Sequence, residues 1–459
     1  MQTISPVDGR VYVERSAASA AEIDATLQRA RTAQRLWCHV PLAERAVLMQ
    51  RFCDEFEAQG ESIAPELSWQ MGRPIRYAPN EVRGTLERAR YMTGIAASAL
   101  ADIDPGPKPG FRRFIRREPL GVVFTVAAWN YPYLIAVNSV IPALLAGNAV
   151  ILKHSAQTPL CAERFAACFA AAGLPAGVFQ VLHLQHADTA AVIRDARIDF
   201  VAFTGSVAGG HAVQRAAAER FIGVGLELGG CDPVYVRHDA DLPHAIENIV
   251  DGAYFNSGQS CCGLQRIYVH ESVHERFTAG CIELVRNYRL GEPLDPATTL
   301  GPVVRTAAAD TVRVQLRSAI AAGARPAIDE REFPLSRAGT PYLAPQLLLD
   351  APAASTVMRE EIFGPVAGVM KVHSDEEAIG QMNASPFGLT AAIWTRDEAA
   401  ALALGQQVET GTWFMNRCDY LDPALAWVGV KDSGRGCTLS VVGFEHLTRP
   451  KSFHLRVTT

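Results

Sequence analysis

The feature that most limits the fold is an uncharged stretch, because no charged side chain occurs between Glu118 and Lys153. A stretch of this length is typical either of a membrane span or of the interior of a large soluble domain. Polar and helix-breaking residues, among them Asn130, Pro132 and Asn138, interrupt it and argue against a span. Its ends, GVVFTV and AVILK, are rich in β-branched residues and flank the more helical NSVIPALLA. The pattern predicts strand, loop, helix and strand, buried on both faces of a parallel α/β sheet.

The rest of the chain extends this rhythm. Residues 19–102 show helical periodicity throughout, with apolar residues at three- and four-residue steps. From 121 to 230, the strand-like runs GVVFTV, AVILK, VFQVL, FVAFTG and IGVGLEL alternate with amphipathic segments, as in a doubly wound nucleotide-binding sheet. A second α/β region begins after Cys231 and runs to about residue 440. At 459 residues the chain is long enough for several such units.

Composition excludes several classes of protein and partner. With 49% hydrophobic residues, 20% charged residues and a net charge of -5, the chain has the profile of a soluble globular protein. It lacks the basic excess that drives binding to nucleic acid or to an anionic membrane, so neither is expected as a partner. The 10 cysteines form no CxxC pair and no Cys/His spacing for zinc, so no metal site and free thiols are predicted. The N-terminus has no signal-peptide pattern, which favours the cytoplasm.

Three segments at the ends of predicted strands carry residues that are able to do chemistry. Residues 203–210, FTGSVAGG, form either an amide-lined pyrophosphate site or only a tight strand-to-helix turn. In GLELGG, a desolvated Glu227 would gain a raised pKa suited to a general base, unless it lies in solvent or in an ion pair. Residues 255–263, FNSGQSCCG, place two adjacent cysteines after a polar loop, where one is either a reactive thiolate or an inert buried thiol.

Together with their neighbours these segments resemble the aldehyde dehydrogenase superfamily. The motifs AWNYP, ILKHSAQTP, FTGS, LELGG, FNSGQSCC, EEIFGP and KDSGRG occur in the family's order, and the resemblance runs from ISPVDGRVY to the C-terminal tail. It implies a Rossmann-type dinucleotide-binding domain, an α/β catalytic domain and a small β arm that joins subunits into a homodimer or homotetramer. The implied boundaries are 1–102 with 120–230 for the first domain, 231–440 for the second, and 103–119 with 441–459 for the arm.

The resemblance also implies a reaction, the NAD(P)-dependent oxidation of an aldehyde to a carboxylic acid. Cys261 matches the nucleophile, and Glu227 matches the base that activates the thiol or the deacylating water. The Asn130 side-chain amide and the Cys261 N–H would hold the oxyanion. A carboxylate at 227 argues against relatives that pass the acyl group to coenzyme A. That acylating activity, and a catalytically idle scaffold, are the two alternatives.

NAD or NADP is the implied cofactor. The positions that match its contacts are Trp129, Lys153, Ser155, Ala156, Gly205, Ser206, Leu228, Glu361 and Phe363. NAD-preferring relatives usually carry at position 156 a Glu that binds the ribose hydroxyls and repels a 2′-phosphate. Because Ala156 stands there, we expect both cofactors to be accepted and leave the preference open. His154 beside it either adds a donor or is solvated.

The substrate tunnel is assigned by the same matching. Its expected lining residues are Tyr131, Ile135, Asn138, Ser260, Cys262 and Trp427. Succinate-semialdehyde enzymes often have a carboxylate-binding arginine at the position of Asn138. Its absence argues against an acidic aldehyde without excluding one, and the physiological aldehyde stays open.

Overall fold

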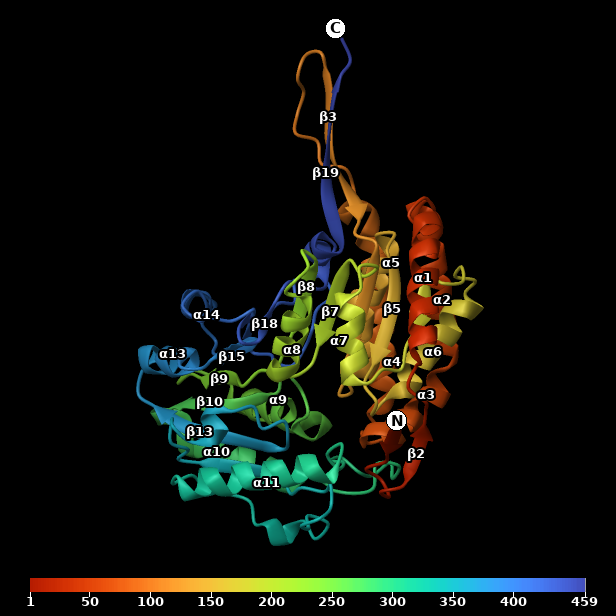
Figure 1. The fold of residues 1–459 in the computed structure, drawn as a ribbon. Coiled ribbons are helices and arrows are strands. Elements are labelled where there is room, and N and C mark those ends of the chain that lie inside the picture. Colours follow the sequence, from red (N-terminus) through yellow and green to blue (C-terminus); the bar gives the residue numbers. More distant parts are fainter. Residues whose placement is uncertain (459) are drawn as a thin grey trace.

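The computed structural model describes residues 1–458, which fold into two large sheets, their covering helices and a projecting arm (Figure 1). A further two-stranded sheet pairs β14 (Phe387–Gly388) with β17 (Val430–Lys431). A short hairpin of β1 (Gln2–Ile4) and β2 (Val11–Glu14) precedes four helices, as the periodicity of residues 19–102 predicts. These helices are α1 (Ala20–Trp37), α2 (Leu42–Ala58), α3 (Gly60–Met71) and α4 (Ala78–Ala99). Ser19 and Glu22 form a capping box that fixes the start of α1.

The first sheet has the strand order β18-β8-β7-β4-β5-β6. It contains β4 (Val122–Ala127), β5 (Ala149–His154), β6 (Phe179–Val181), β7 (Phe200–Thr204), β8 (Gly223–Glu227) and β18 (Gly434–Arg435). All neighbours are parallel except β18, which is antiparallel to β8. The connecting helices are α5 (Pro132–Leu145), α6 (Pro159–Ala171), α7 (His186–Arg194) and α8 (Val207–Ala217). The strand order reverses between β4 and β7, where open α/β sheets bind ligands.

The uncharged stretch forms β4, α5 and β5, and nearly all of it is buried. This confirms the predicted strand, helix and strand. Among residues 1–458, no helix combines the length and apolar character needed to cross a membrane.

The second sheet has the order β11-β12-β13-β10-β9-β15-β16. Its strands are β9 (Asp232–Val236), β10 (Leu264–His270), β11 (Arg325–Pro326), β12 (Gln346–Leu349), β13 (Val366–Val372), β15 (Thr390–Trp394) and β16 (Thr412–Met415). The helices around it are α9 (Leu242–Tyr254), α10 (Glu271–Arg286), α11 (Thr306–Ala321), α12 (Thr356–Arg359), α13 (Asp375–Asn383) and α14 (Glu398–Gly405). Only β11 is antiparallel to its neighbour, so the predicted second α/β unit is present.

The arm pairs β3 (Phe111–Pro119) with β19 (Thr448–Arg456) in antiparallel register and projects from the body, with the C-terminus at its tip (Figure 1). Phe114 and Phe453 stack across it at a ring-centroid distance of 4.5 Å.

Two short segments lie outside the units implied for them. Phe444 and Leu447, assigned above to the arm, are buried in the main core, and α15 (Ser440–Gly443) contacts α4. Residues 434–435, assigned to the second unit, form β18 of the first sheet because they pair with β8. The division into domains otherwise stays a prediction, and residue 459 lies outside the described residues.

Candidate active site

A cavity of about 460 Å³ lies where α4, the start of α5, the 255–263 loop and the 418–427 segment meet. All six residues expected in the substrate tunnel line it, together with Cys261 and Glu227. The structure thus brings together side chains that are up to about three hundred positions apart in the chain, although their contact with substrate stays a prediction.

The two adjacent cysteines have different surroundings. Cys261 is half-buried and faces the cavity, whereas Cys262 is buried and donates its thiol hydrogen to Asp419 Oδ1 at 2.9 Å. Hydrogen bonding to Cys261, and then burial, raise the pKa of Cys262 well above its usual value. Burial also raises the pKa of Asp419 to about 7. Of these two adjacent thiols, Cys261 is therefore the more exposed, as its predicted role as the nucleophile requires.

The loop before Cys261 has an unusual backbone. Asn256, Ser257 and Gly258 are consecutive left-handed residues with φ of 53°, 57° and 69°. A Cβ on Gly258 would overlap the carbonyl of Gly364, so glycine is required there. This turn presents Cys261 at the cavity surface, and its backbone N–H has no hydrogen-bond acceptor within residues 1–458.

Asn130 is held against the same loop. Its side-chain Nδ2 donates to the carbonyl of Gln259 at 3.2 Å, two residues before Cys261. Its own carbonyl accepts from Arg73 Nη2 at 2.6 Å and from Asn256 Nδ2 at 3.2 Å. The amide expected to stabilise the oxyanion therefore lies beside the nucleophile loop.

Arg73 and Glu81, which the sequence reasoning missed, anchor this region. They form an ion pair with side-chain exposures of 2% and 0%. Glu81 also accepts the backbone N–H groups of Tyr133 and Leu134 at 3.0 and 3.1 Å, at the start of α5. A signal did exist, because Glu81 falls on the apolar period of α4 and not on its polar face.

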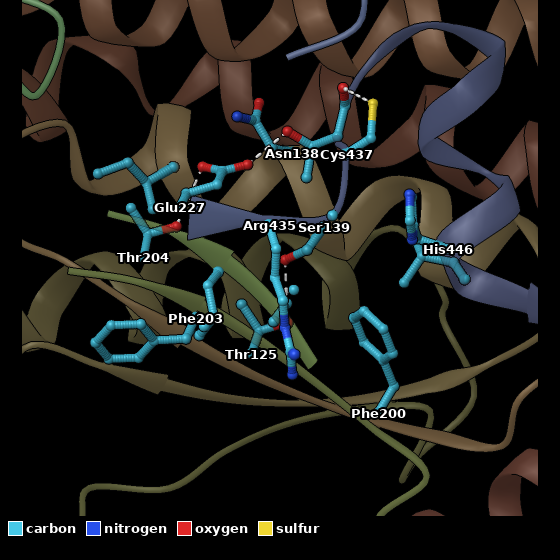
Figure 2. A pocket seen from close by; sticks show the side chains of 17 residues that line it. Thr125, Asn138, Ser139, Phe200, Phe203, Thr204, Glu227, Arg435, Cys437 and His446 are labelled. Atoms are coloured by element: carbon cyan, nitrogen blue, oxygen red, sulfur yellow. Dashed lines mark hydrogen bonds between the residues drawn. The ribbon is translucent and has the colours of Figure 1, made fainter. Parts of the chain in front are cut away.

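Glu227 ends β8, and its carboxylate accepts hydrogen bonds from the hydroxyls of Thr204 and Thr438 at 3.2 and 2.5 Å. Figure 2 shows Glu227 and Thr204 in a second pocket, which shares these two residues with the cavity and is also lined by Phe200 and Arg435. The residue is half-buried and lines both that pocket and the cavity at Cys261, and no cation within residues 1–458 forms an ion pair with it. Burial raises the pKa of Glu227, while the two hydroxyls and Arg88 oppose that rise. The desolvated environment expected for a general base is present.

Most of the residues expected to hold the cofactor lie at or just after the carboxyl ends of β4, β5, β7 and β8, whereas Glu361 and Phe363 follow α12. Ser206 caps α8 by accepting from the Gly209 N–H at 3.2 Å, which leaves the first amides of that helix free for a phosphate. Gly205 precedes it, and buried Leu228 packs against Gly210 of the same helix. Trp129 and Phe363 meet edge to face at 5.6 Å.

Glu361 precedes β13 of the second sheet and contacts Gly229 and Gly230, which follow β8 of the first sheet. It accepts the Gly230 N–H at 3.3 Å, and burial raises its pKa to about 7. A Cβ on Gly229 would overlap its carboxylate, so a glycine there allows the approach. Among residues 1–458, no carboxylate pairs with Lys153, and burial lowers its pKa. Its free ammonium group, with the open start of α8, fits a dinucleotide.

The end of β5 shows the surroundings of His154 and of Ala156, two positions that the sequence alone leaves open. His154 is not solvated: it is buried, contacts the Pro132 carbonyl at 3.1 Å, and burial lowers its pKa to about 4. Ala156 is exposed, while the Ser155 hydroxyl accepts the Gln157 N–H at 3.2 Å. The described residues place no carboxylate at 156 to repel a 2′-phosphate.

Comparison with known proteins identifies the architecture. The model of the aldehyde dehydrogenase family matches residues 1–453. A protein named succinate-semialdehyde dehydrogenase (NADP+) from Mycobacterium avium (strain 104) is 34% identical over 453 residues, covering 98% of this chain and 95% of its own. A betaine aldehyde dehydrogenase from Cereibacter sphaeroides is also 34% identical over 453 residues, covering 98% and 93%.

A solved structure has the same fold. The succinic semialdehyde dehydrogenase from Streptococcus pyogenes in complex with NADP+ superposes with a TM-score of 0.95 at 27% identity, covering 99% of both chains. The similarity includes both sheets and the arm.

Proposed function

The chain belongs to the aldehyde dehydrogenase family, and from this premise we propose that the cavity at Cys261 is its active site. The protein oxidises an aldehyde to a carboxylic acid and uses NAD or NADP. The observation that carries the site assignment is the position of one half-exposed thiol, Cys261, and one desolvated carboxyl, Glu227, on the same cavity.

In the proposed reaction the Cys261 thiolate attacks the aldehyde carbon, and the carbonyl oxygen becomes an oxyanion. The free Cys261 N–H and the Asn130 amide, which swings from the Gln259 carbonyl, donate to that oxyanion. When bound, NAD(P) would supply the acceptor for the hydride that leaves the aldehyde carbon. A thioester then remains on Cys261.

Glu227 completes the cycle. Its carboxylate removes a proton from the water that attacks the thioester carbonyl, and the carboxylic acid leaves as the thiol is regenerated. Thr204 and Thr438 hold the carboxylate in place. Lys153, Ser206, Glu361 and Phe363 are proposed to orient the dinucleotide at the edge of the first sheet.

The arm supports a further proposal, that the chain forms a homodimer or homotetramer. Among residues 1–458, no strand covers the outer edge of β19, whereas the outer edge of β3 is bridged at Ile115 by Ile103; an uncovered edge favours pairing with another copy. The molar mass in solution checks this.

The decisive experiment follows the absorbance of the reduced nicotinamide with aliphatic, aromatic, amino and acidic aldehydes and either cofactor, without coenzyme A. Turnover is expected, and Cys261→Ala should abolish it, leaving less than about one part in 10⁴, while the cofactor still binds. Cys262→Ala is the matched control and should stay within a few-fold of the native rate. Turnover by Cys261→Ala would overturn the assignment of the nucleophile, and dependence on coenzyme A would establish the acylating alternative.

A further inference from the structure

Arg88 of α4 is a buried cation on the cavity wall. Its residue exposure is 9%, and its Nη1 donates to the Leu134 carbonyl at 2.9 Å and to Asn138 Oδ1 at 3.1 Å. Within residues 1–458, its Nε and Nη2 groups donate no hydrogen bond and no carboxylate lies within ion-pair distance. These nitrogens are also not fully enclosed, so they open onto the cavity that Arg88 lines.

The other two arginines on this cavity differ from Arg88. Arg73 is paired with Glu81, and Arg83 is exposed and donates to Asn80 Oδ1. A buried guanidinium without an anion is unfavourable because it has lost its hydration and gained no counter-charge. Burial accordingly lowers the pKa of Arg88, which the nearby Glu81 and Glu227 only partly offset.

We propose that Arg88 binds an anionic group of the substrate, so that the preferred aldehydes are ω-oxo acids, which carry a carboxylate at the end opposite the aldehyde. This inference rests on the proposed function, since it takes Cys261 as the attacking group. The carboxylate of the substrate supplies the counter-charge, and a planar guanidinium with two free N–H groups suits it. Asn138 and the Leu134 carbonyl fix the orientation of the guanidinium.

The proposal revises the expectation drawn from Asn138. The missing arginine at 138 argued against an acidic aldehyde, but the structure brings a guanidinium to the same place from another element. Asn138 serves here as the acceptor that holds this cation.

Matched substrates test the proposal in the full-length enzyme. The value of kcat/KM is measured for ω-oxo acids and for n-alkanals with the same number of carbons. The native enzyme should prefer the acids, and Arg88→Met should lower kcat/KM for them about 10- to 100-fold, mainly through KM. For alkanals the change should stay within about three-fold, since they offer Arg88 no charge. Arg88→Lys should restore part of the loss. Arg90→Met, which removes an exposed arginine of α4 that pairs with Glu57 and does not line the cavity, should change little.

Three outcomes would overturn the proposal. An equal loss of activity on acids and alkanals in Arg88→Met would mean that Arg88 acts through Glu227 or through the fold. A native preference for alkanals would mean that no anion is recognised. A preference for an aldehyde with a quaternary ammonium group would assign recognition to Asp419 instead.

A second measurement uses only the native enzyme and does not depend on turnover. The alkylation of Cys261 by iodoacetamide in the native enzyme is followed with dicarboxylates, the products of ω-oxo acids, or with monocarboxylates of equal length. Dicarboxylates should protect Cys261 at a concentration at least about ten-fold lower. Equal protection would refute the role of Arg88 even if oxidation is established, whereas protection without any turnover would leave the anion site standing and count against the proposed function.

Discussion

Two walls of the cavity place their functional residues in different ways. The nucleophile wall consists of Tyr131, Ser260, Cys261, Cys262 and Trp427, and the α4 wall consists of Asn80, Glu81, Arg83, Glu87 and Arg88. The first is built from turns and loops that follow strands or precede them, such as the left-handed turn before Cys261. The second is one face of a single long helix.

This difference explains why functional residues in the nucleophile wall can be predicted from sequence motifs, whereas those in the α4 wall cannot. In the nucleophile wall, each short segment must supply both an unusual backbone and a reactive group, so residue type and spacing are tightly constrained. In the α4 wall, helical spacing alone brings Glu81 and Arg88 to the buried side, seven positions apart. A charged residue in a helix is usually solvated, so such a residue is recognised as functional only when its burial is known.

The sharpest test of the α4 wall is the buried ion pair. Glu81→Gln keeps an acceptor for the Tyr133 and Leu134 N–H groups but leaves Arg73 as an uncompensated buried cation. The free energy of unfolding should fall by about 3–5 kcal/mol, measured by urea denaturation. Glu87→Gln is the control, because Glu87 is exposed on the same helix and only accepts from Tyr420. Equal effects of both substitutions would break the distinction between the buried and the exposed residues of α4.

Much of the fold was predictable because burial leaves a pattern in the sequence. Burial on both faces makes β4, α5 and β5 uncharged, and the period of the strands and helices follows from their packing. The packing of Phe444 and Leu447 into the core was not predictable, because the resemblance implies only an arm that begins at 441 and no local pattern marks these contacts. The surroundings of His154 were left open for the same reason, because nothing local shows that its ring contacts the Pro132 carbonyl.

A substitution of Glu227 tests the reaction proposed at Cys261. Glu227→Gln should lower the steady-state rate about 10²-fold, because the thioester loses its general base, while the first turnover still releases reduced cofactor. Burial raises the native pKa of Glu227, so the base form appears only as the pH rises through that raised value. The native rate should therefore increase with pH across this range, and the Gln variant should lose that increase. Rapid-mixing and steady-state assays over a pH series provide the measurement, and a near-native steady-state rate would remove Glu227 from the mechanism.

The smallest effect is expected at Ala156, just after the end of β5. We expect the residue type at this position to influence the choice between NAD and NADP. Ala156→Glu places a carboxylate on an exposed position beside Lys153, where it would repel a 2′-phosphate and accept from ribose hydroxyls. We expect kcat/KM for NADP to fall about ten-fold and that for NAD to stay within about two-fold, because one uncompensated like-charge contact at a partly solvated site costs about 1–2 kcal/mol. Ala156→Gln has nearly the same size without the charge and should leave the ratio close to native. If both variants shift the ratio equally, bulk and not charge decides the preference, and residue type at this strand end is less informative than at the nucleophile wall.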